Sequence, residues 1–224
     1  MFLGLREFVE RVDDIGELER VSGAHWDREM SAISELVCKG PRDPKPALMF
    51  DDIPDYPSGH RTLYAMTNSA NRLAVAVGMD PDYDKPMEFI RDYRDHAAAL
   101  GTDSIVDPEF VGAESAPLFE NRHVDEAVDI FSLPVPFHHD DDGGRYIGTG
   151  DCVITRDPET GQHNVGTYRM QAFGEREVGA MIAPGHHGRE HIEAYHERGD
   201  PAPIVALYGM DPTLWIFSSL GPHH

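Results

Sequence analysis

The sequence predicts an α+β fold, and two observations lead to that prediction. Apolar residues recur at helical spacing near the N-terminus, whereas short apolar runs separated by glycine and proline dominate after about residue 116. This change predicts an N-terminal mixed α/β domain over residues 1–115 and a second domain over 116–224. A chain of 224 residues is long enough to bury about 70% of the surface that its unfolded form exposes.

The N-terminal part is predicted to combine helices with a buried strand. The apolar positions from Leu5 onward predict an amphipathic helix over 5–18. The continuous apolar run Ala47 to Phe50 predicts a buried strand. Similar helical patterns predict three more helices, over residues 28–38, 71–77 and 87–100.

The second part is predicted to contain a β-hairpin. The turn 157–161 contains Pro and Gly and joins two expected strands, 151–156 and 163–172. A helix is expected over 188–198, because Gly199 and Pro201 end the pattern. The remaining apolar runs predict strands over 178–182 and 204–208, and either a strand or a buried helix over 214–219.

The charge of the chain excludes several classes of partner. Forty Asp and Glu against 19 Lys and Arg give a formal net charge of -21, so nucleic acids and acidic membranes would be repelled. The acids are spread over the whole chain, which is typical of a surface adapted to high salt, and we hypothesise a halophilic source.

The cysteine content and hydropathy indicate a cytoplasmic protein. Only two cysteines, Cys38 and Cys152, are present, so neither a disulfide framework nor a four-cysteine zinc site is available. No apolar run approaches the ~18 residues that a membrane-spanning helix needs. Met1 leads into a polar helix instead of a signal peptide.

The run from Asn164 to Gly188 carries the clearest functional signal. It places a neutral oxygen donor (Asn164), a permanent cation (Arg169) and an imidazole (His186) in one strand-loop-helix unit, which suits binding of a metal, a phosphate and a carboxylate. Asn164 and Arg169 are five residues apart and would point to opposite faces of a regular strand. We therefore expect an irregularity around residues 165–167, where Gly166 permits a bulge or bend.

Residues 184–188, Pro-Gly-His-His-Gly, are predicted to begin a helix whose free N-H groups favour an anion. The plainer alternative is that the histidines only cap the helix. A further alternative is an H-x-x-E-H zinc peptidase motif formed by His187, Glu190 and His191.

Five motifs together resemble the UbiD-like decarboxylases, which use prenylated FMN. They are residues 143–150, 155–161, 164–171, 184–188 and Ser218-Ser219. The resemblance covers the whole chain but only about the first half of a typical member. It implies that the second domain is an incomplete split β-barrel of the flavin-reductase-like kind, which binds prenylated FMN.

The resemblance also assigns site residues. Asn164 and His186 would bind a divalent metal, usually manganese, which holds the flavin phosphate beside a potassium ion. Arg169 would be catalytic and hold the substrate carboxylate. Besides these three, the residues expected near the cofactor are Thr149, Thr167, Tyr168, Met181, Ile182, Ala183, His187, Ser218 and Ser219.

The implied reaction is reversible non-oxidative decarboxylation of an aromatic or α,β-unsaturated carboxylic acid. The third metal ligand and the acid/base carboxylates of the family would follow residue 224. Two interpretations stay open. In one, a second chain supplies the C-terminal half of a split enzyme, and in the other the chain is a truncated, inactive remnant that binds flavin phosphate. Both are compatible with a homo-oligomer and with either prenylated or plain FMN.

Overall fold

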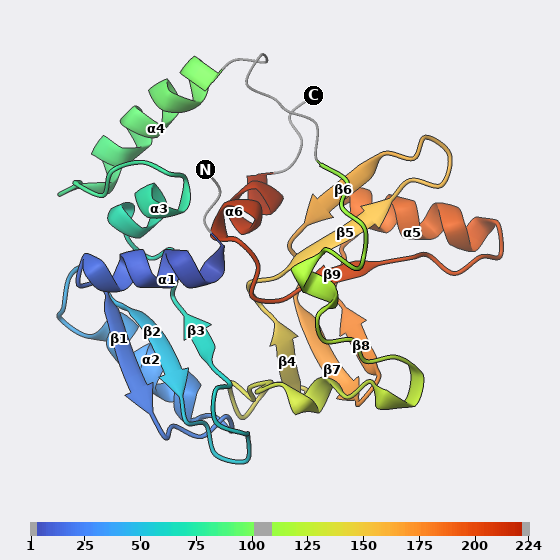
Figure 1. The fold of residues 1–224 in the computed structure, drawn as a ribbon, viewed down its shortest axis with the longest axis horizontal. Helices are drawn as coiled ribbons and strands as arrows, with labels where there is room; N and C mark the ends of the chain where they lie inside the picture. Colours follow the sequence, from blue (N-terminus) through green and yellow to red (C-terminus); the bar gives the residue numbers. More distant parts are fainter. Residues whose placement is uncertain (1–3, 101–108, 221–224) are drawn as a thin grey trace.

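The structure is a computed structural model that describes residues 4–100 and 109–220 (Figure 1). Its N-terminal part is built on a three-stranded sheet of β1 (Leu18–Ser22), β2 (Ala47–Asp51) and β3 (Thr62–Tyr64), in that order. β1 runs parallel to β2, and β3 is antiparallel to β2. The helices of this part are α1 (Leu5–Asp14), α2 (Glu29–Lys39), α3 (Ala70–Ala76) and α4 (Pro86–Leu100).

The apolar run of β2 is buried on both faces because different helices cover them. Ala47 and Met49 pack in one cluster with Phe8 and Val12 of α1. The alternate residues, including Phe50, belong to a second cluster with residues of α2. This two-sided burial explains why the strand reads as a continuous apolar run instead of an alternating one.

Most of the predicted N-terminal elements are confirmed, with one correction. The predicted helix over 5–18 ends at Asp14, and Gly16 adopts a left-handed conformation with φ +72° that helices commonly use to terminate. Leu18 then begins β1, and neither this strand nor β3 was predicted from the sequence. The apolar pattern predicted a helix as far as residue 18 because Leu18 packs in the same cluster as Phe8 and Val12, although Leu18 lies on a strand.

The second part contains two separate three-stranded antiparallel sheets. One has the order β4 (Arg145–Gly148), β7 (Met170–Gly174), β8 (Glu177–Ala180). The other has the order β6 (His163–Gly166), β5 (Cys152–Arg156), β9 (Val205–Leu207). The helix α5 (His187–Glu197) packs against β5. Among residues 109–144, three short 3-10 helices precede β4: Pro117–Phe119, Asp125–Ala127 and Ile130–Ser132.

The predicted hairpin is confirmed in its first half and corrected in its second. β5 and β6 pair in register, with Arg156 opposite His163, and Gly161 donates its N-H to Asp157 O in the turn. The predicted strand over 163–172 does not continue, however, because β6 ends at Gly166 and β7 begins at Met170 in the other sheet. We call residues 167–169 the crossover segment.

The expected irregularity therefore exists, but it lies at 167–169 and is a change of sheet instead of a bulge within one strand. It has the predicted consequence that Asn164 and Arg169 are not related by strand alternation. No hydrogen-bonded closure joins the two sheets within residues 109–220, so the split barrel stays a prediction, as does a domain boundary near 115.

The last helix, α6 (Pro212–Leu220), settles the choice left open for 214–219 in favour of a helix. It lies between the two parts of the molecule, beside α1 (Figure 1). Ile216 packs on the N-terminal core, and the Thr213 hydroxyl donates to Ala76 O at 2.5 Å. The helix therefore fixes the second part against the first.

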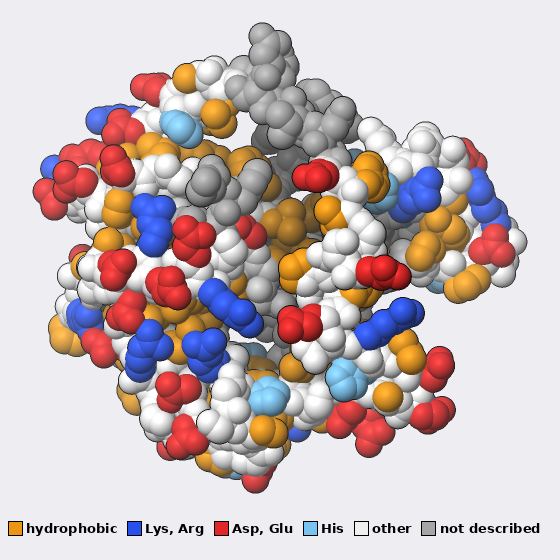
Figure 2. Space-filling model, viewed as in Figure 1, with side chains coloured by type: hydrophobic (Ala, Val, Ile, Leu, Met, Phe, Trp, Pro, Cys, Tyr) orange, Lys and Arg blue, Asp and Glu red, His pale blue; other side chains and the backbone are white. Residues whose placement is uncertain are grey.

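Acidic side chains are spread over the face shown in Figure 2, and hydrophobic side chains are visible at the bottom of a hollow between the left and right parts. In the described ranges 4–100 and 109–220, no helix is both long and apolar enough to cross a membrane.

Candidate functional site

Tyr168, in the crossover segment, occupies the centre of the predicted site. Its side chain is only 6% exposed and packs with Val153 and Ile182. Two glycines leave room for the ring, since a Cβ atom on Gly166 would lie 2.6 Å from Tyr168 Cζ and one on Gly188 would lie 2.9 Å from its hydroxyl oxygen. Neither contact is sterically possible, so both glycines are required for this position of the ring.

Tyr168 brings together the two predicted metal ligands. The Asn164 side-chain amide donates to the Tyr168 hydroxyl at 3.4 Å. The His186 ring meets the Tyr168 ring edge to face, with centroids 5.9 Å apart and an interplanar angle of 85°. Asn164 lies on β6 and His186 at the N-terminal cap of α5, so the two residues come from different elements and share one neighbour.

The side chain of His186 makes no capping hydrogen bond to the start of α5. The plainer interpretation of the histidines, as helix caps, is therefore wrong for His186. His187 is the first residue of α5 and is half-buried.

Arg169 follows Tyr168 and is exposed. Its carbonyl oxygen accepts the N-H of Met181 at 3.1 Å, which ties the crossover segment to the residue after β8. The guanidinium forms no ion pair with any residue in the described part of the chain. It is therefore free to bind an anionic group, which suits the predicted carboxylate contact.

The hydroxyl residues of α6 reach the crossover segment. Thr167 Oγ1 lies 2.7 Å from Ser218 Oγ and 3.4 Å from Ser219 Oγ. Both serine hydroxyls also donate to Trp215 O, at 2.7 and 3.1 Å. Ser218 is 7% exposed and Ser219 is exposed, so the second hydroxyl is the accessible member of the cluster.

The remaining predicted residues divide into three groups. Ile182 is 9% exposed and packs on Tyr168, so it belongs to the wall of the site. Met181 is 60% exposed and Ala183 is half-buried beside it. Thr149 is exposed in the loop between β4 and β5 and lines a cavity whose other walls include residues of the N-terminal part, and Tyr168 does not line that cavity.

Asp151 is a candidate functional residue that the sequence analysis did not identify. Its side chain is fully buried at the start of β5, and neither carboxylate oxygen has a hydrogen-bond partner of good geometry among the described residues. Burial raises the pKa of Asp151 to about 6, and nearby backbone N-H groups, including that of Tyr168, oppose the rise. The sequence did contain a sign that this acid is buried, because it stands directly before the run Cys152 to Thr155, whose residues are largely buried.

The zinc peptidase alternative finds no support in the geometry. Within residues 4–100 and 109–220, no group of three or more His, Cys, Asp or Glu side chains is arranged to hold a metal ion. His191 Nδ1 instead lies 3.0 Å from Thr155 Oγ1, so this histidine joins α5 to β5. Asn164 and His186 each contact Tyr168 and carry an amide oxygen and an imidazole, two types of donor that bind divalent metals in proteins.

Two family models match the sequence. Residues 9–90 match the 3-octaprenyl-4-hydroxybenzoate carboxy-lyase N-terminal domain, and residues 109–223 match the 3-octaprenyl-4-hydroxybenzoate carboxy-lyase Rift-related domain. The chain is 29% identical to a phenolic acid decarboxylase of Escherichia coli O157:H7 over 97% of its own length and 45% of that protein. It is 30% identical to a phenolic acid decarboxylase of a Streptomyces species, over 96% of its own length and 44% of that protein.

Solved structures agree with these matches. The vanillic acid decarboxylase of Sedimentibacter hydroxybenzoicus, in its closed form, superposes with a TM-score of 0.84 at 27% identity, over 98% of this chain and 45% of that one. The UbiD-class enzyme HmfF of Pelotomaculum thermopropionicum, in an evolved dimeric form in complex with prFMN, gives a TM-score of 0.77 at 25% identity, over 93% and 45%. The chain thus spans about half the length of the relatives it matches. From these matches we conclude that it belongs to the UbiD family of carboxy-lyases.

Proposed function

We propose that this chain is the flavin- and metal-binding half of a decarboxylase that uses prenylated FMN to release carbon dioxide from an aromatic or α,β-unsaturated carboxylic acid. A second chain supplies the remaining carboxylates. The observation that supports this proposal best is the convergence of Asn164 and His186 on Tyr168, with Arg169 next in sequence. Self-association of the chain stays a prediction.

The residues around Tyr168 suit the phosphate end of a flavin nucleotide. Asn164 and His186 would hold a divalent metal, manganese by preference, and the metal would neutralise the phosphate with potassium beside it. The hydroxyls of Thr167 and Ser219 lie where they could donate to phosphate oxygens. The bound cofactor would supply the electron sink on which decarboxylation depends.

Arg169 would place the substrate. Its free guanidinium can form a charge-assisted, bidentate contact with a carboxylate. A carboxylate held by an arginine is oriented for loss of carbon dioxide but is stabilised as an anion. Loss of carbon dioxide is also favoured when water is excluded from the bond that breaks.

Purification of the protein from its own source tests the proposal. We expect a second polypeptide to co-purify, with bound prenylated FMN and with carbon dioxide release from phenolic or unsaturated acids. Arg169→Ala should abolish turnover while the flavin stays bound, because the phosphate end does not use that side chain. Arg198→Ala is the matched control, since Arg198 pairs with Glu159 at 3.0 Å in the hairpin turn.

The competing interpretation is an inactive remnant that binds flavin phosphate. A lone, colourless chain that shows no turnover after reconstitution with prenylated FMN and manganese would support the remnant and refute the enzyme. Full turnover by Arg169→Ala would refute the role of that arginine.

A further inference from the structure

Asp151 lies where the chain passes twice between the two sheets of the second part. The loop 149–151 leads from β4 in one sheet to β5 in the other, and the crossover segment leads back from β6 to β7. Asp151 is the last residue of that loop, and its side chain is fully buried. Its carboxyl group therefore lies in the interior, at the junction of the two sheets.

The carboxylate of Asp151 packs directly against the end of β4. A Cβ atom on Gly148 would lie 2.3 Å from Asp151 Oδ2 and 2.9 Å from Asp151 Cγ, so only a glycine leaves room for the carboxylate there. Gly148 pairs with Met170, which is the first residue after the crossover segment. The carboxylate is thus separated from the crossover segment by a single strand pairing.

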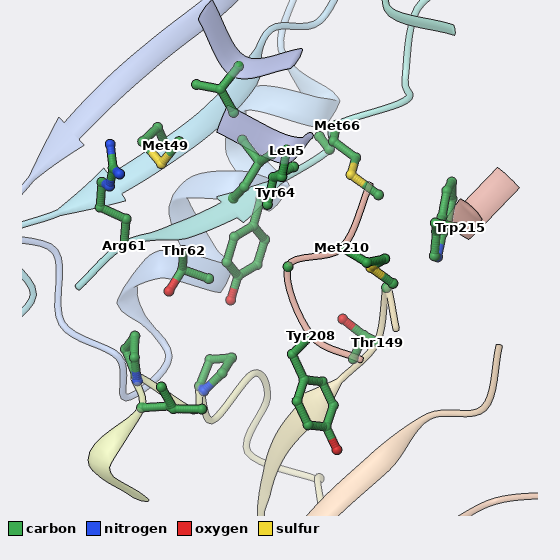
Figure 3. A pocket seen from close by; sticks show the side chains of 18 of the residues that line it. Leu5, Met49, Arg61, Thr62, Tyr64, Met66, Thr149, Tyr208, Met210 and Trp215 are labelled. Carbon is green, nitrogen blue, oxygen red and sulfur yellow. The ribbon is translucent and has the colours of Figure 1, made fainter. Parts of the chain in front are cut away.

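The hydrogen bonds of this carboxylate are incomplete. Neither oxygen has a partner of good geometry among the described residues, and solvent supplies none because the side chain is fully buried. A cavity of about 820 Å³ beside Tyr64 is lined by Thr149 and Tyr208 but not by Asp151 (Figure 3). A molecule in that cavity would therefore not touch the carboxylate.

The Tyr208 hydroxyl does not supply the missing donor either. Its ring lies on the same side of Gly148 as the carboxylate, since Cε1 is 3.1 Å from the position that a Cβ on Gly148 would take. The hydroxyl, however, donates to Met170 Sδ at 2.9 Å. Tyr208 thus covers the carboxylate without binding it.

The backbone N-H of Tyr168 is the matching donor. No backbone oxygen in residues 4–100 and 109–220 accepts it, and Tyr168 is only 6% exposed. Burial raises the pKa of Asp151 to about 6, and the nearby N-H groups of Asp151 itself and of Tyr168 oppose the rise. Buried N-H groups in folded proteins nearly always have an acceptor, so a small rotation of the carboxyl group satisfies both partners.

A buried carboxyl group lowers the stability of a fold. An amide or apolar side chain of similar size would avoid the unfavourable burial of a charge. Residues that lower stability in this way are expected at sites that bind or react. The segment beside Asp151 is such a site, because it carries Tyr168 and Arg169.

We propose that Asp151 is a positioning residue of the candidate site, whose carboxylate accepts the N-H of Tyr168 and so fixes the crossover segment. Because the peptide unit between Thr167 and Tyr168 is planar, an N-H that is held inward directs the Thr167 carbonyl outward. Arg169 follows directly, so the start of its exposed side chain is fixed as well. The effect on flavin binding rests on the proposed function, whereas the ordering of the segment does not.

Hydrogen exchange of the chain without flavin or metal, followed by mass spectrometry of peptides that contain residues 167–169, tests the positioning. Asp151→Leu removes the acceptor and keeps a side chain of similar size. We expect the Tyr168 amide to exchange about tenfold faster than in the wild type, because it loses a hydrogen bond to a charged group. Peptides from α1 and α2 should keep their protection, since removal of a buried charge does not lower the global stability.

Asp151→Asn should rescue the local order. Its amide oxygen also accepts a hydrogen bond, so exchange of the Tyr168 amide should stay within about threefold of the wild type. The matched control is Thr155→Val, because Thr155 is a buried polar residue of β5 whose hydroxyl lies 3.0 Å from His191 Nδ1 on α5. This control should leave the exchange of residues 167–169 unchanged.

Gly148→Ala tests the same contact without changing Asp151. The added Cβ would displace the carboxylate, so the Tyr168 amide should exchange faster, as in Asp151→Leu. This variant decides the question if Asp151→Leu fails to fold.

Binding of flavin mononucleotide in the presence of Mn²⁺ tests the consequence for the site. Asp151→Leu should weaken this binding by about tenfold, whereas Asp151→Asn should weaken it by less than about threefold. Wild-type protein that binds no flavin would refute the proposed function, and the exchange measurements would then decide the role of Asp151 by themselves.

The positioning role is wrong if exchange of residues 167–169 is unchanged in both Asp151→Leu and Gly148→Ala. It is also wrong if exchange becomes faster to the same extent in all parts of the chain, because that result shows only a loss of global stability. Equal flavin affinity of the wild type and Asp151→Leu would remove Asp151 from the binding site.

Discussion

At the scale of single residues, Tyr168 organises the candidate site. It accepts a hydrogen bond from Asn164 and meets the His186 ring edge to face, and it can lie there because Gly166 and Gly188 have no Cβ atoms. These two glycines are therefore required by packing against the Tyr168 ring. This requirement leads to a direct test.

Gly166→Ala should displace the Tyr168 ring, because the added Cβ would lie 2.6 Å from Cζ. We expect a loss of about 1–3 kcal/mol in the free energy of unfolding, measured by urea denaturation. Gly112→Ala is the matched control, since a Cβ there meets nothing within 4 Å. Equal stability of the Gly166 variant and the wild type would contradict the tight packing around Tyr168.

Asp151 predicts a dependence of stability on pH. Burial raises its pKa in the folded protein from 3.8 to about 6. Folding therefore favours the protonated acid, so its contribution to stability is fully present below pH 3.8 and is lost as the pH rises through about 6.

Asp151→Asn removes this titration. At pH 7 the variant should be more stable than the wild type, by on the order of 2–3 kcal/mol, and the difference should shrink toward pH 4. Urea unfolding of both proteins at a series of pH values measures it. A stability difference that does not change with pH would show that the Asp151 carboxyl titrates normally.

At the scale of elements, the site depends on the passage of the chain from one sheet to the other between β6 and β7. β6 delivers Asn164, the crossover segment delivers Tyr168 and Arg169, and the start of α5 delivers His186. The end of α6 brings its hydroxyls to the same segment. Four pieces of local structure, separated in the chain by β7, β8 and β9, thus supply the residues of the site.

The local parts of this arrangement could be predicted from the sequence. The turn 157–161 predicted the hairpin, and the glycines around His186 predicted the start of α5. The separation of β6 from β7 could not be predicted, because alternation within 163–172 does not say which strand each residue pairs with. Asp151 and the cavity beside Tyr64 were missed because burial and unpaired polar atoms depend on tertiary packing.

The buried pair of Glu17 and Arg72 joins the residue before β1 to α3 and predicts a large stability effect. Glu17→Gln should lower the free energy of unfolding by about 3–5 kcal/mol, because the Arg72 charge stays buried without its partner. Glu19→Gln, two residues later and within β1, is the control, since Glu19 pairs with Arg42 at the surface and its substitution should cost less than about 1 kcal/mol. Equal effects of the two substitutions would contradict the structure.

At the scale of the whole molecule, two features dominate: the chain spans about half the length of its relatives, and its net charge is -21. The fold class and the family were predicted from the sequence because the motifs are local and specific. A halophilic source stays a prediction from the charge alone.

The charge predicts a response to salt. The thermal midpoint of unfolding should rise between about 0.1 M and molar potassium chloride, because the Debye length falls from about 10 Å to about 3 Å and self-repulsion is screened. Differential scanning calorimetry at several salt concentrations measures the change. A midpoint that falls with added salt would refute the halophilic hypothesis.

Metal-dependent binding of flavin mononucleotide, followed by quenching of flavin fluorescence, tests the central claim most directly. The convergence of Asn164 and His186 on Tyr168 predicts that the chain binds the flavin in the presence of Mn²⁺. It also predicts that chelation of the metal, Asn164→Ala or His186→Ala each removes this binding. Binding that is indifferent to the metal and to both substitutions would contradict the account, as would no binding at all.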